Sequence, residues 1–232
     1  MNVGYCFTRN LYDKVLPSIR SLLAHNKVKM LYIMCEDDEL PFDIPCPHKI
    51  INVAGQTIFN DVNRNSRFTY MAMMRITFAN YIKADRIIYL DVDTIVCDSL
   101  KPIWEIDMTG KWWAAVQEYK GSYKPYGDTY YNSGVGVYNL KQIREDGIMW
   151  KWVNELNTRE YRYTEQCVLN KFCVPDKVVS LPVRFNNSFC CGYTPDPAIV
   201  HFAGHVNWWN RTNYPQSDYL QRWKEMGRVT TV

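Results

Sequence analysis

The amino-acid sequence predicts an α/β protein in which a mostly parallel, mixed sheet is flanked by helices. Short apolar runs of strand length alternate with longer segments whose apolar residues recur at helical spacing. This alternation is typical of sheets whose parallel strands are joined by helices lying on both faces. A chain of 232 residues can bury a core of its own. We therefore expect one domain, 1–232, whose last part, about 210–232, is a helical tail.

Each element is expected from its local pattern. Continuous apolar runs rich in Val, Ile and aromatic residues predict strands at 2–8, 29–35, 48–53, 86–96, 111–118, 134–140 and 198–204. Apolar residues three or four positions apart predict helices at 11–25, 67–82, 141–157 and 164–172. Pro17 fits best near a first turn or at a kink of its helix, and Gly147 is a tolerated interruption.

The composition excludes some classes of function. Hydrophobic residues at 47% and charged residues at 22% are ordinary for a globular protein. A net charge of +3 without a run of Lys or Arg argues against a dedicated nucleic-acid binder. Aromatic residues make up 15% of the chain. They either line a site for sugars or bases or simply fill the core, and the sequence leaves both interpretations open.

The cysteines and the N-terminus indicate a cytoplasmic location. No signal peptide is visible in "MNVGYCFTRN", and no apolar run approaches the length of a membrane span. The eight cysteines form no C-x-x-C motif and several lie in apolar runs, so we expect them to be reduced. The N-x-S/T triplets at Asn186 and Asn210 are then chance matches.

The tail carries an apolar stripe on an expected helix, formed by Tyr219, Leu220, Trp223 and Met226. Basic residues lie beside the stripe. Such a helix usually packs on its own domain. The alternative is peripheral contact with a membrane surface.

The segment "RIIYLDVDTIVCDSL" brings two aspartates to the end of an apolar strand. Ligands of such sheets gather beyond the carboxyl ends of the strands, which places Thr8, Asp91, Asp93 and His201 at one rim. Residues i and i+2 of a strand share a face, so Asp91 and Asp93 can point at one object. Two close carboxylates repel unless a cation lies between them, and Mg²⁺ or Mn²⁺ suits oxygen ligands. The alternative is a strand end entering a turn, where Asp is common.

Three further segments carry polar residues next to apolar runs. "YNSGVGVYNL" places Asn132, Ser133 and Gly134 at a strand entrance, where Gly allows close backbone approach to a ligand. "YTEQCVLNKF" offers Glu165 and Gln166 at the start of a helix, although Thr164 could cap that helix and Glu165 could serve only its dipole. "VHFAGHVNWW" supplies His201 after a strand. Neither a G-x-G-x-x-G motif nor a P-loop is present.

Together these segments resemble glycosyltransferase family 8, the retaining family that includes glycogenin and bacterial lipopolysaccharide galactosyltransferases. The resemblance begins at "FTRNLY", continues through "MMRITFANYI", "RIIYLDVDTIV" and "YNSGVGVYNL", and ends at "HFAGHVNWW". It implies a Rossmann-like GT-A fold and a UDP-sugar-dependent hexosyltransferase. Such an enzyme would move glucose or galactose to a glycan, lipid-linked or other hydroxyl acceptor. Mn²⁺, with Mg²⁺ as the alternative, is the implied cofactor.

The resemblance also implies roles for individual residues. The implied metal ligands are Asp91, Asp93 and His201. Residues implied at the UDP-sugar are Thr8 and Tyr12 near the uracil, with Tyr12 stacking on the base, and Arg75, Asp91, Val92, Asp93, Gly204 and His205. The implied catalytic residues beside the donor sugar are Gln166, Asn132 and Glu165.

Two positions depart from the family pattern. Glu165 stands where the family commonly has Asp, so its carboxylate reaches one methylene further. Asn207 stands where the family usually has a Lys that neutralises the diphosphate. Either His205 or Arg211 supplies this charge, or the leaving group is stabilised less.

Two other functions compete with the transferase. A haloacid dehalogenase-like phosphatase also ends an apolar strand with D-x-D-x-T, as in "YLDVDTI", but its motif lies near the chain start. A sugar-nucleotide-binding protein that has lost catalysis is the second alternative, and Asn207 is its main support.

Overall fold

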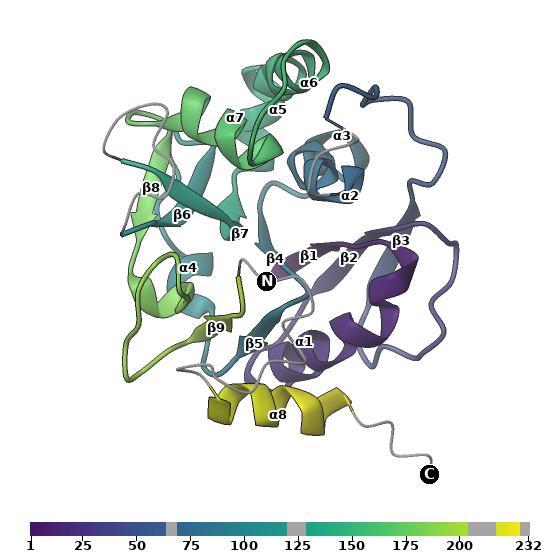
Figure 1. Ribbon diagram of the computed structural model, residues 1–232, viewed down its shortest axis with the longest axis vertical. Helices are drawn as coiled ribbons and strands as arrows, with labels where there is room; N and C mark the ends of the chain where they lie inside the picture. Colours follow the sequence, from purple (N-terminus) through teal and green to yellow (C-terminus); the bar gives the residue numbers. More distant parts are fainter. Residues whose placement is uncertain (64–68, 120–128, 204–216, 228–232) are drawn as a thin grey trace.

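The computed structural model, which describes residues 1–63, 69–119, 129–203 and 217–227, contains a seven-stranded sheet and a separate two-stranded ribbon (Figure 1). The main sheet has the order β3-β2-β1-β4-β7-β6-β8, and the ribbon pairs β5 with β9. The strands are β1 (Asn2–Cys6), β2 (Met30–Cys35), β3 (His48–Asn52), β4 (Ile87–Leu90), β5 (Thr94–Val96), β6 (Trp113–Gln117), β7 (Tyr131–Tyr138), β8 (Val178–Leu181) and β9 (Ile199–His201). The expected mixed, mostly parallel sheet is confirmed.

The direction of β7 decides what meets at the rim of the sheet. Strands β3, β2, β1 and β4 are mutually parallel, whereas β7 is antiparallel to both β4 and β6. Leu90 at the end of β4 therefore pairs with Val135 near the start of β7. The end of β6 likewise lies beside the start of β7, where Gln117 pairs with Tyr131. The carboxyl ends of β1, β4 and β6 thus share one rim with the first residues of β7.

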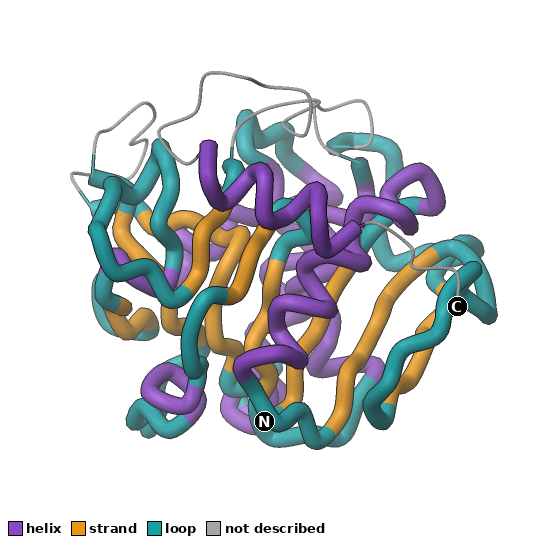
Figure 2. Tube along the Cα trace, turned by 90° about the horizontal axis from the view of Figure 1, so that it is seen from below, coloured by secondary structure: helices purple, strands orange, loops and turns teal. Residues whose placement is uncertain are grey.

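Helices cover both faces of the sheet, because alternate strand residues supply two apolar cores. Ile88 and Leu90 of β4 face the core under α1 (Tyr12–His25), whereas Ile87 and Tyr89 face the opposite core. The second core is covered by α2 (Tyr70–Met74), α3 (Phe78–Tyr81), α5 (Leu140–Glu145), α6 (Ile148–Thr158) and α7 (Thr164–Cys173). Figure 2 views the molecule from the α1 side, where helices lie across the strands.

The expected strand 86–96 is wrong as one element, because the chain turns between Asp91 and Asp93. Residues 87–90 belong to the main sheet, whereas 94–96 pair with β9 in the ribbon. Thr94 Oγ1 donates a hydrogen bond to Asp91 O at 2.7 Å and stabilises the turn. The two carboxylates therefore approach each other across a turn, not along one face of a strand.

The helices 67–82 and 141–157 are each interrupted, contrary to expectation. The first becomes α2, a short 3₁₀ turn η2 (Arg75–Thr77) and α3, because Arg75 Nε and Thr77 Oγ1 donate to the carbonyls of Ala72 and Met74. The second divides at Gly147, whose φ of +61° ends α5. Pro17 lies inside α1, beyond its first turn.

Several short elements had no sequence signal strong enough to predict. These are β8, the short helix α4 (Lys101–Trp104) and the 3₁₀ turns η1 (Arg9–Leu11) and η3 (Val183–Phe185). All of them are short. Strand β8 also lies at the edge of the sheet, where one of its residues is exposed and another partly exposed, so its apolar pattern is weak.

The tail forms helix α8 (Ser217–Gly227), which packs on its own domain as expected. Leu220 and Trp223 are buried against Ile95 and Val200 of the ribbon and against Phe202, which follows β9. The apolar stripe is thus already covered. No helix among the described residues is long and apolar enough to cross a membrane. All eight cysteines are free thiols in the structure.

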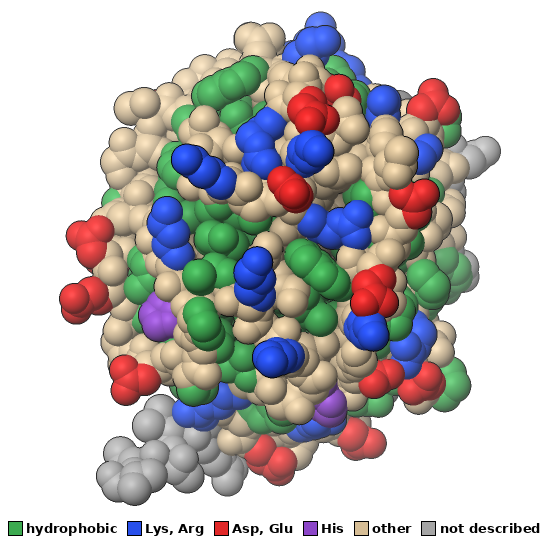
Figure 3. All heavy atoms as spheres, turned by 180° about the vertical axis from the view of Figure 1, so that it is seen from behind, with side chains coloured by type: hydrophobic (Ala, Val, Ile, Leu, Met, Phe, Trp, Pro, Cys, Tyr) green, Lys and Arg blue, Asp and Glu red, His purple; other side chains and the backbone are tan. Residues whose placement is uncertain are grey.

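Charged side chains are mixed on the surface face shown in Figure 3. Lys and Arg are interspersed there with hydrophobic and acidic side chains instead of forming a continuous track. The distribution agrees with the small net charge of +3.

Replacing Trp223 with Ala should lower the free energy of unfolding by about 3–5 kcal/mol, because a large buried ring between α8 and the ribbon is lost. Urea denaturation measures the change. Lys224→Ala on the exposed side of the same helix is the control and should change stability by no more than about 0.5 kcal/mol. An equally small effect of Trp223→Ala would show that α8 does not stabilise the domain.

Candidate active site

Polar side chains from four strands meet at the rim because of the strand directions described above. Asp91 follows β4, and its backbone N–H donates to Gly134 O near the start of β7 at 2.8 Å. Asp93 precedes β5, and its carbonyl accepts from Phe202 N at 2.9 Å. This bond places His201, the last residue of β9, beside the turn. Glu118 follows β6 at the same rim.

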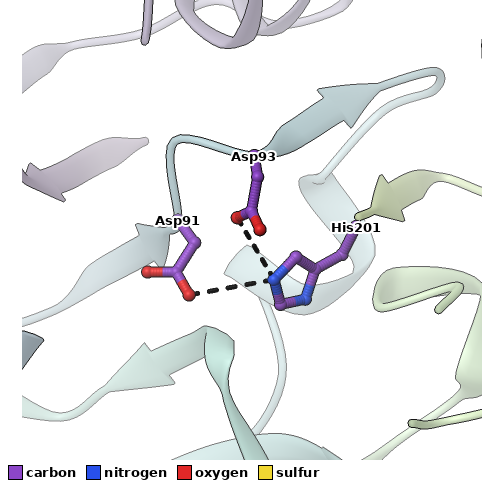
Figure 4. Close-up of side chains that lie close together, drawn as sticks. All are labelled: Asp91, Asp93 and His201. Atoms are coloured by element: carbon purple, nitrogen blue, oxygen red, sulfur yellow. Dashed lines mark ion pairs between the residues drawn. The ribbon is translucent and has the colours of Figure 1, made fainter. Parts of the chain in front are cut away.

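Asp91, Asp93 and His201 converge on one point, as Figure 4 shows. One ligand atom from each lies within 4.8 Å of the other two. His201 Nε2 is 3.3 Å from Asp93 Oδ1 and 3.8 Å from Asp91 Oδ2. The side chains of Asp91 and Asp93 keep 24% and 17% of their surface exposed, whereas His201 keeps 3%. The two carboxylates are therefore accessible to solvent, whereas the imidazole is enclosed by protein.

These three groups fit a divalent cation. Carboxylate oxygens with one imidazole nitrogen suit ions such as Mn²⁺, and two carboxylates offset the charge of a divalent ion. The electrostatics of His201 agree with this interpretation. Burial opposes a charged ring, but Asp93 and Asp91 outweigh burial and raise the pKa of His201. The two carboxylates make the electrostatic potential at His201 Nε2 negative, and a negative potential attracts a metal cation as it attracts a proton.

Gly134 leaves room for this cluster. A β-carbon at position 134 would lie 2.2 Å from His201 Cε1 and 2.6 Å from Asp91 Oδ2. Both distances are far below van der Waals contact, so only Gly lets β7 pass behind the two side chains. The close neighbours of Gly134 are thus protein groups, and the approach of its backbone to a ligand stays a prediction.

Arg75 lies at the centre of a buried ionic cluster. Its Nη2 is 2.9 Å from Asp91 Oδ1 and its Nε is 3.3 Å from Glu165 Oε1. The guanidinium carbon lies 4.5 Å from the centre of the Tyr89 ring. Burial raises the pKa of Glu165, and Arg75 opposes that rise. Glu165 is thus bound to Arg75 and does not merely cap the helix dipole.

Asn132, Ser133 and Gln166 form a hydrogen-bonded group next to this cluster. Gln166 Oε1 accepts from Ser133 N at 3.0 Å, which ties α7 to β7. Asn132 Nδ2 and Gln166 Nε2 both donate to Glu118 Oε1, at 3.1 and 3.2 Å. Burial raises the pKa of Glu118, while these two bonds oppose the rise. The three candidates Asn132, Gln166 and Glu165 therefore lie together, in contact with Arg75 or Glu118.

Thr8 and Tyr12 lie at a different part of the rim, around the end of β1. Tyr12 is buried, and its hydroxyl donates to Asp37 Oδ2 at 2.8 Å. Arg9 forms two hydrogen bonds with the same carboxylate. Tyr12, Arg9 and Asp37 line an open hollow together with Glu39, Leu40 and Pro41. Stacking of Tyr12 on a base therefore remains a prediction.

Of the other predicted site residues, only Val92 lies in the part of the chain that the structure describes. Val92, between the two aspartates, is buried. Gly204, His205, Asn207 and Arg211 lie outside the described residues.

Sequence reasoning missed Glu118 and Asn186. Glu118 directly follows the apolar strand run "WAAV" and one Gln, so the rule that singled out Asp91 would have found it. Asn186 is fully buried and its Oδ1 lies 2.9 Å from His201 Nδ1. Its segment has no local pattern that indicates such a contact. Burial of Asn186 also agrees with its N-x-S triplet being a chance match.

Comparison with known proteins identifies relatives along nearly the whole chain. The model of the family described as "Glycosyl transferase family 8" matches residues 2–213. A putative glycosyltransferase of Haemophilus influenzae is 30% identical over 161 residues, which are 59% of this chain and 48% of the relative. Glycosyltransferase GlyD of Streptococcus pneumoniae is 28% identical over 94% of this chain and 29% of its own length. The chain thus spans about half or less of these relatives.

Solved structures share the fold. An active-site mutant of LgtC superimposes with a TM-score of 0.79 at 20% identity, covering 100% of this chain and 97% of that one. The galactosyltransferase LgtC in complex with donor and acceptor sugar analogues gives 0.76 at 20% identity, with the same coverage. Glycosyltransferase GlyE of Streptococcus pneumoniae gives 0.75 at 18% identity over 98% of this chain and 60% of that one. The expected GT-A fold is confirmed.

Gly134→Ala should weaken binding of Mn²⁺ at least about tenfold, because the added methyl group displaces His201 or Asp91. Isothermal titration calorimetry measures the affinity. Gly55→Ala, where the β-carbon meets nothing within 4 Å, is the matched control and should bind Mn²⁺ like the wild type. Unchanged binding by Gly134→Ala would place the ion elsewhere.

Mn²⁺ binding should weaken as the pH falls, because a proton and the metal compete for His201 Nε2. The pKa of His201 is raised, so the loss begins above pH 6.5 and approaches about tenfold per pH unit below that pKa. Calorimetric titrations between pH 6 and 9 measure this dependence. In His201→Gln the side chain does not titrate, and the profile should be flat over this range; a wild-type profile equally flat would exclude His201 as a ligand.

Proposed function

The chain belongs to glycosyl transferase family 8, and we propose that it transfers a hexose from a UDP-sugar to a hydroxyl acceptor in a metal-dependent reaction that retains the anomeric configuration. The observation that carries the proposal is the convergence of Asp91, Asp93 and His201 at the carboxyl rim of the sheet. The family match decides against the phosphatase alternative. Glucose or galactose as the sugar, and a glycan or lipid-linked acceptor, complete the proposal.

Asp91, Asp93 and His201 would hold the Mn²⁺ or Mg²⁺ ion. When bound, the ion supplies positive charge that offsets the negative charge growing on the departing diphosphate. Arg75 orients Asp91 through its 2.9 Å ion pair. The carboxylate thus needs little reorganisation when a ligand arrives, and preorganised groups of this kind lower the barrier most.

Asn132, Gln166 and Glu165 would border the donor sugar. Their side chains are held by Glu118, Ser133 and Arg75, so their positions are set before the donor binds. We propose attack by the acceptor on the face from which the diphosphate leaves, with the departing phosphate accepting the acceptor's proton. Inversion of the anomeric centre, seen by NMR of the product, would exclude this course.

We also propose that the chain acts in the cytoplasm. Its support is the set of eight cysteines without a disulfide, which is usual where thiols are kept reduced.

Asp93→Asn should lower the rate at which the donor is cleaved at least about a hundredfold, because one charge-stabilising group at a transition state is worth roughly 3 kcal/mol. A panel of UDP-sugars with Mn²⁺ measures slow hydrolysis of each donor, which requires no acceptor. Asp85→Asn, an exposed carboxylate near the other end of β4, is the matched control and should retain the wild-type rate.

The same screen is repeated with the metal chelated. Donor hydrolysis that persists without a divalent ion, or at an unchanged rate in Asp93→Asn, would reject the metal-dependent proposal. Binding of UDP and Mn²⁺ without turnover of any donor would favour the sugar-nucleotide-binding alternative.

A further inference from the structure

A chain of buried hydrogen bonds lies behind the candidate metal ligands. Asn132 Oδ1 accepts from Gly134 N at 3.0 Å and from Asn186 Nδ2 at 2.9 Å. Asn186 Oδ1 in turn lies 2.9 Å from His201 Nδ1. Asn132, Asn186 and His201 are all buried, so no water competes freely for these groups. The chain connects a backbone amide of β7 to the imidazole at the end of β9.

One member of this chain fixes the direction of every bond. The Gly134 backbone N–H can only donate, so the Asn132 atom that faces it is the oxygen. Asn132 Nδ2 is then directed to Glu118, which accepts. The same Asn132 oxygen requires a donor from Asn186, which orients the Asn186 amide with its nitrogen toward Asn132 and its oxygen toward His201.

The orientation of Asn186 determines which nitrogen of His201 carries hydrogen. An amide oxygen only accepts, so His201 Nδ1 must donate to it. The lone pair of the neutral ring is then on Nε2. This atom is the one that faces Asp93 Oδ1 and Asp91 Oδ2, at 3.3 and 3.8 Å. The tautomer and the ring orientation therefore suit a cation held between Nε2 and the two carboxylates.

We propose that Asn186 is the positioning residue of His201: it keeps the hydrogen on Nδ1 and thereby presents Nε2 to a divalent cation. The proposal rests on the proposed function in requiring that the rim binds such an ion. Ligating histidines usually donate their second N–H to a carboxylate or a backbone carbonyl, which fixes the ring and strengthens the ligand. Here a neutral amide has this role, and Asn132 locks its orientation.

A purely structural role for Asn186 would give a different ranking of variants. Asn186→Asp keeps an oxygen that accepts from His201 Nδ1 but buries a charge. Asn186→Leu has nearly the same size but offers no acceptor. If Asn186 only fills space and satisfies bonds, the Asp variant should be as harmful as the Leu variant or more so. If Asn186 orients His201, the Asp variant should retain the ligand and the Leu variant should lose it.

The test follows Mn²⁺ binding in the presence of UDP, without turnover. Pulsed electron paramagnetic resonance detects the coupling of bound Mn²⁺ to a ligated imidazole nitrogen, and calorimetry gives the affinity. We expect Asn186→Leu to lose the nitrogen coupling and to bind Mn²⁺ about 10–100-fold more weakly. We expect Asn186→Asp to keep the coupling and to bind Mn²⁺ more tightly than Asn186→Leu does.

Asn187→Leu is the matched control. Asn187 is also buried, but its Oδ1 accepts from Thr194 N at 2.7 Å. This variant should lose stability in thermal unfolding while keeping the nitrogen coupling. If Asn186→Leu does not fold, Asn186→Asp decides alone, because loss of the coupling in the folded Asp variant overturns the proposal.

Other outcomes separate the two proposals. A nitrogen coupling that persists in Asn186→Leu, or an Asp variant that binds Mn²⁺ no better than the Leu variant, overturns the role of Asn186 and leaves the proposed function intact. A wild-type protein that shows no ligated nitrogen overturns both.

Discussion

The ion pair between the buried Arg75 and the partly exposed Asp91 is the interaction on which the rim of the sheet depends. Asp91, Asp93 and Glu165 bring three acidic groups close together, and such groups repel each other or take up protons unless positive charge is supplied. Arg75 supplies it to Asp91 and Glu165 at once, while its guanidinium rests on Tyr89. Removing one partner of a buried pair is costly, because it leaves the other charge uncompensated. Among the described residues, the basic group that pairs with Asp93 is His201, at 3.3 Å, so the negative charge is offset least where the ion would bind.

The antiparallel strand β7 converts this local arrangement into a site. In a wholly parallel sheet the first residues of a strand would lie at the edge opposite the carboxyl ends. Because β7 runs the other way, Asn132, Ser133 and Gly134 lie beside the ends of β4 and β6. Gly134 then lets Asp91 and His201 lie against the strand, and Ser133 joins it to Gln166 of α7. The reversal of a single strand is therefore what brings the candidate metal ligands and the candidate sugar-binding residues together.

Much of this could be predicted from the sequence, because the strands of the main sheet are apolar runs and the rim rule needs only their ends. The rule located Asp91, Asp93 and His201 correctly, and the structure brings them within ligand distance. Local patterns failed where the decisive partner is distant. The turn at 91–93 exists because residues 94–96 pair with β9, a hundred positions away, and no periodicity in "RIIYLDVDTIV" shows it. Asn186 was missed for the same reason: its role follows from contacts with Asn132 and His201, not from its neighbours in sequence.

The three candidate ligands are divided between two sheets, and this division has a consequence for the whole molecule. Asp91 is anchored to β7 of the main sheet, whereas Asp93 and His201 are joined to each other through the β5–β9 ribbon. The candidate ligand atoms thus come from two separate sheets. The distances between these atoms depend on how the β5–β9 ribbon lies against the main sheet. Helix α8 presses on the outer side of the ribbon through Leu220 and Trp223. Packing of α8 therefore supports the strands of the ribbon, next to which two of the three candidate ligands lie.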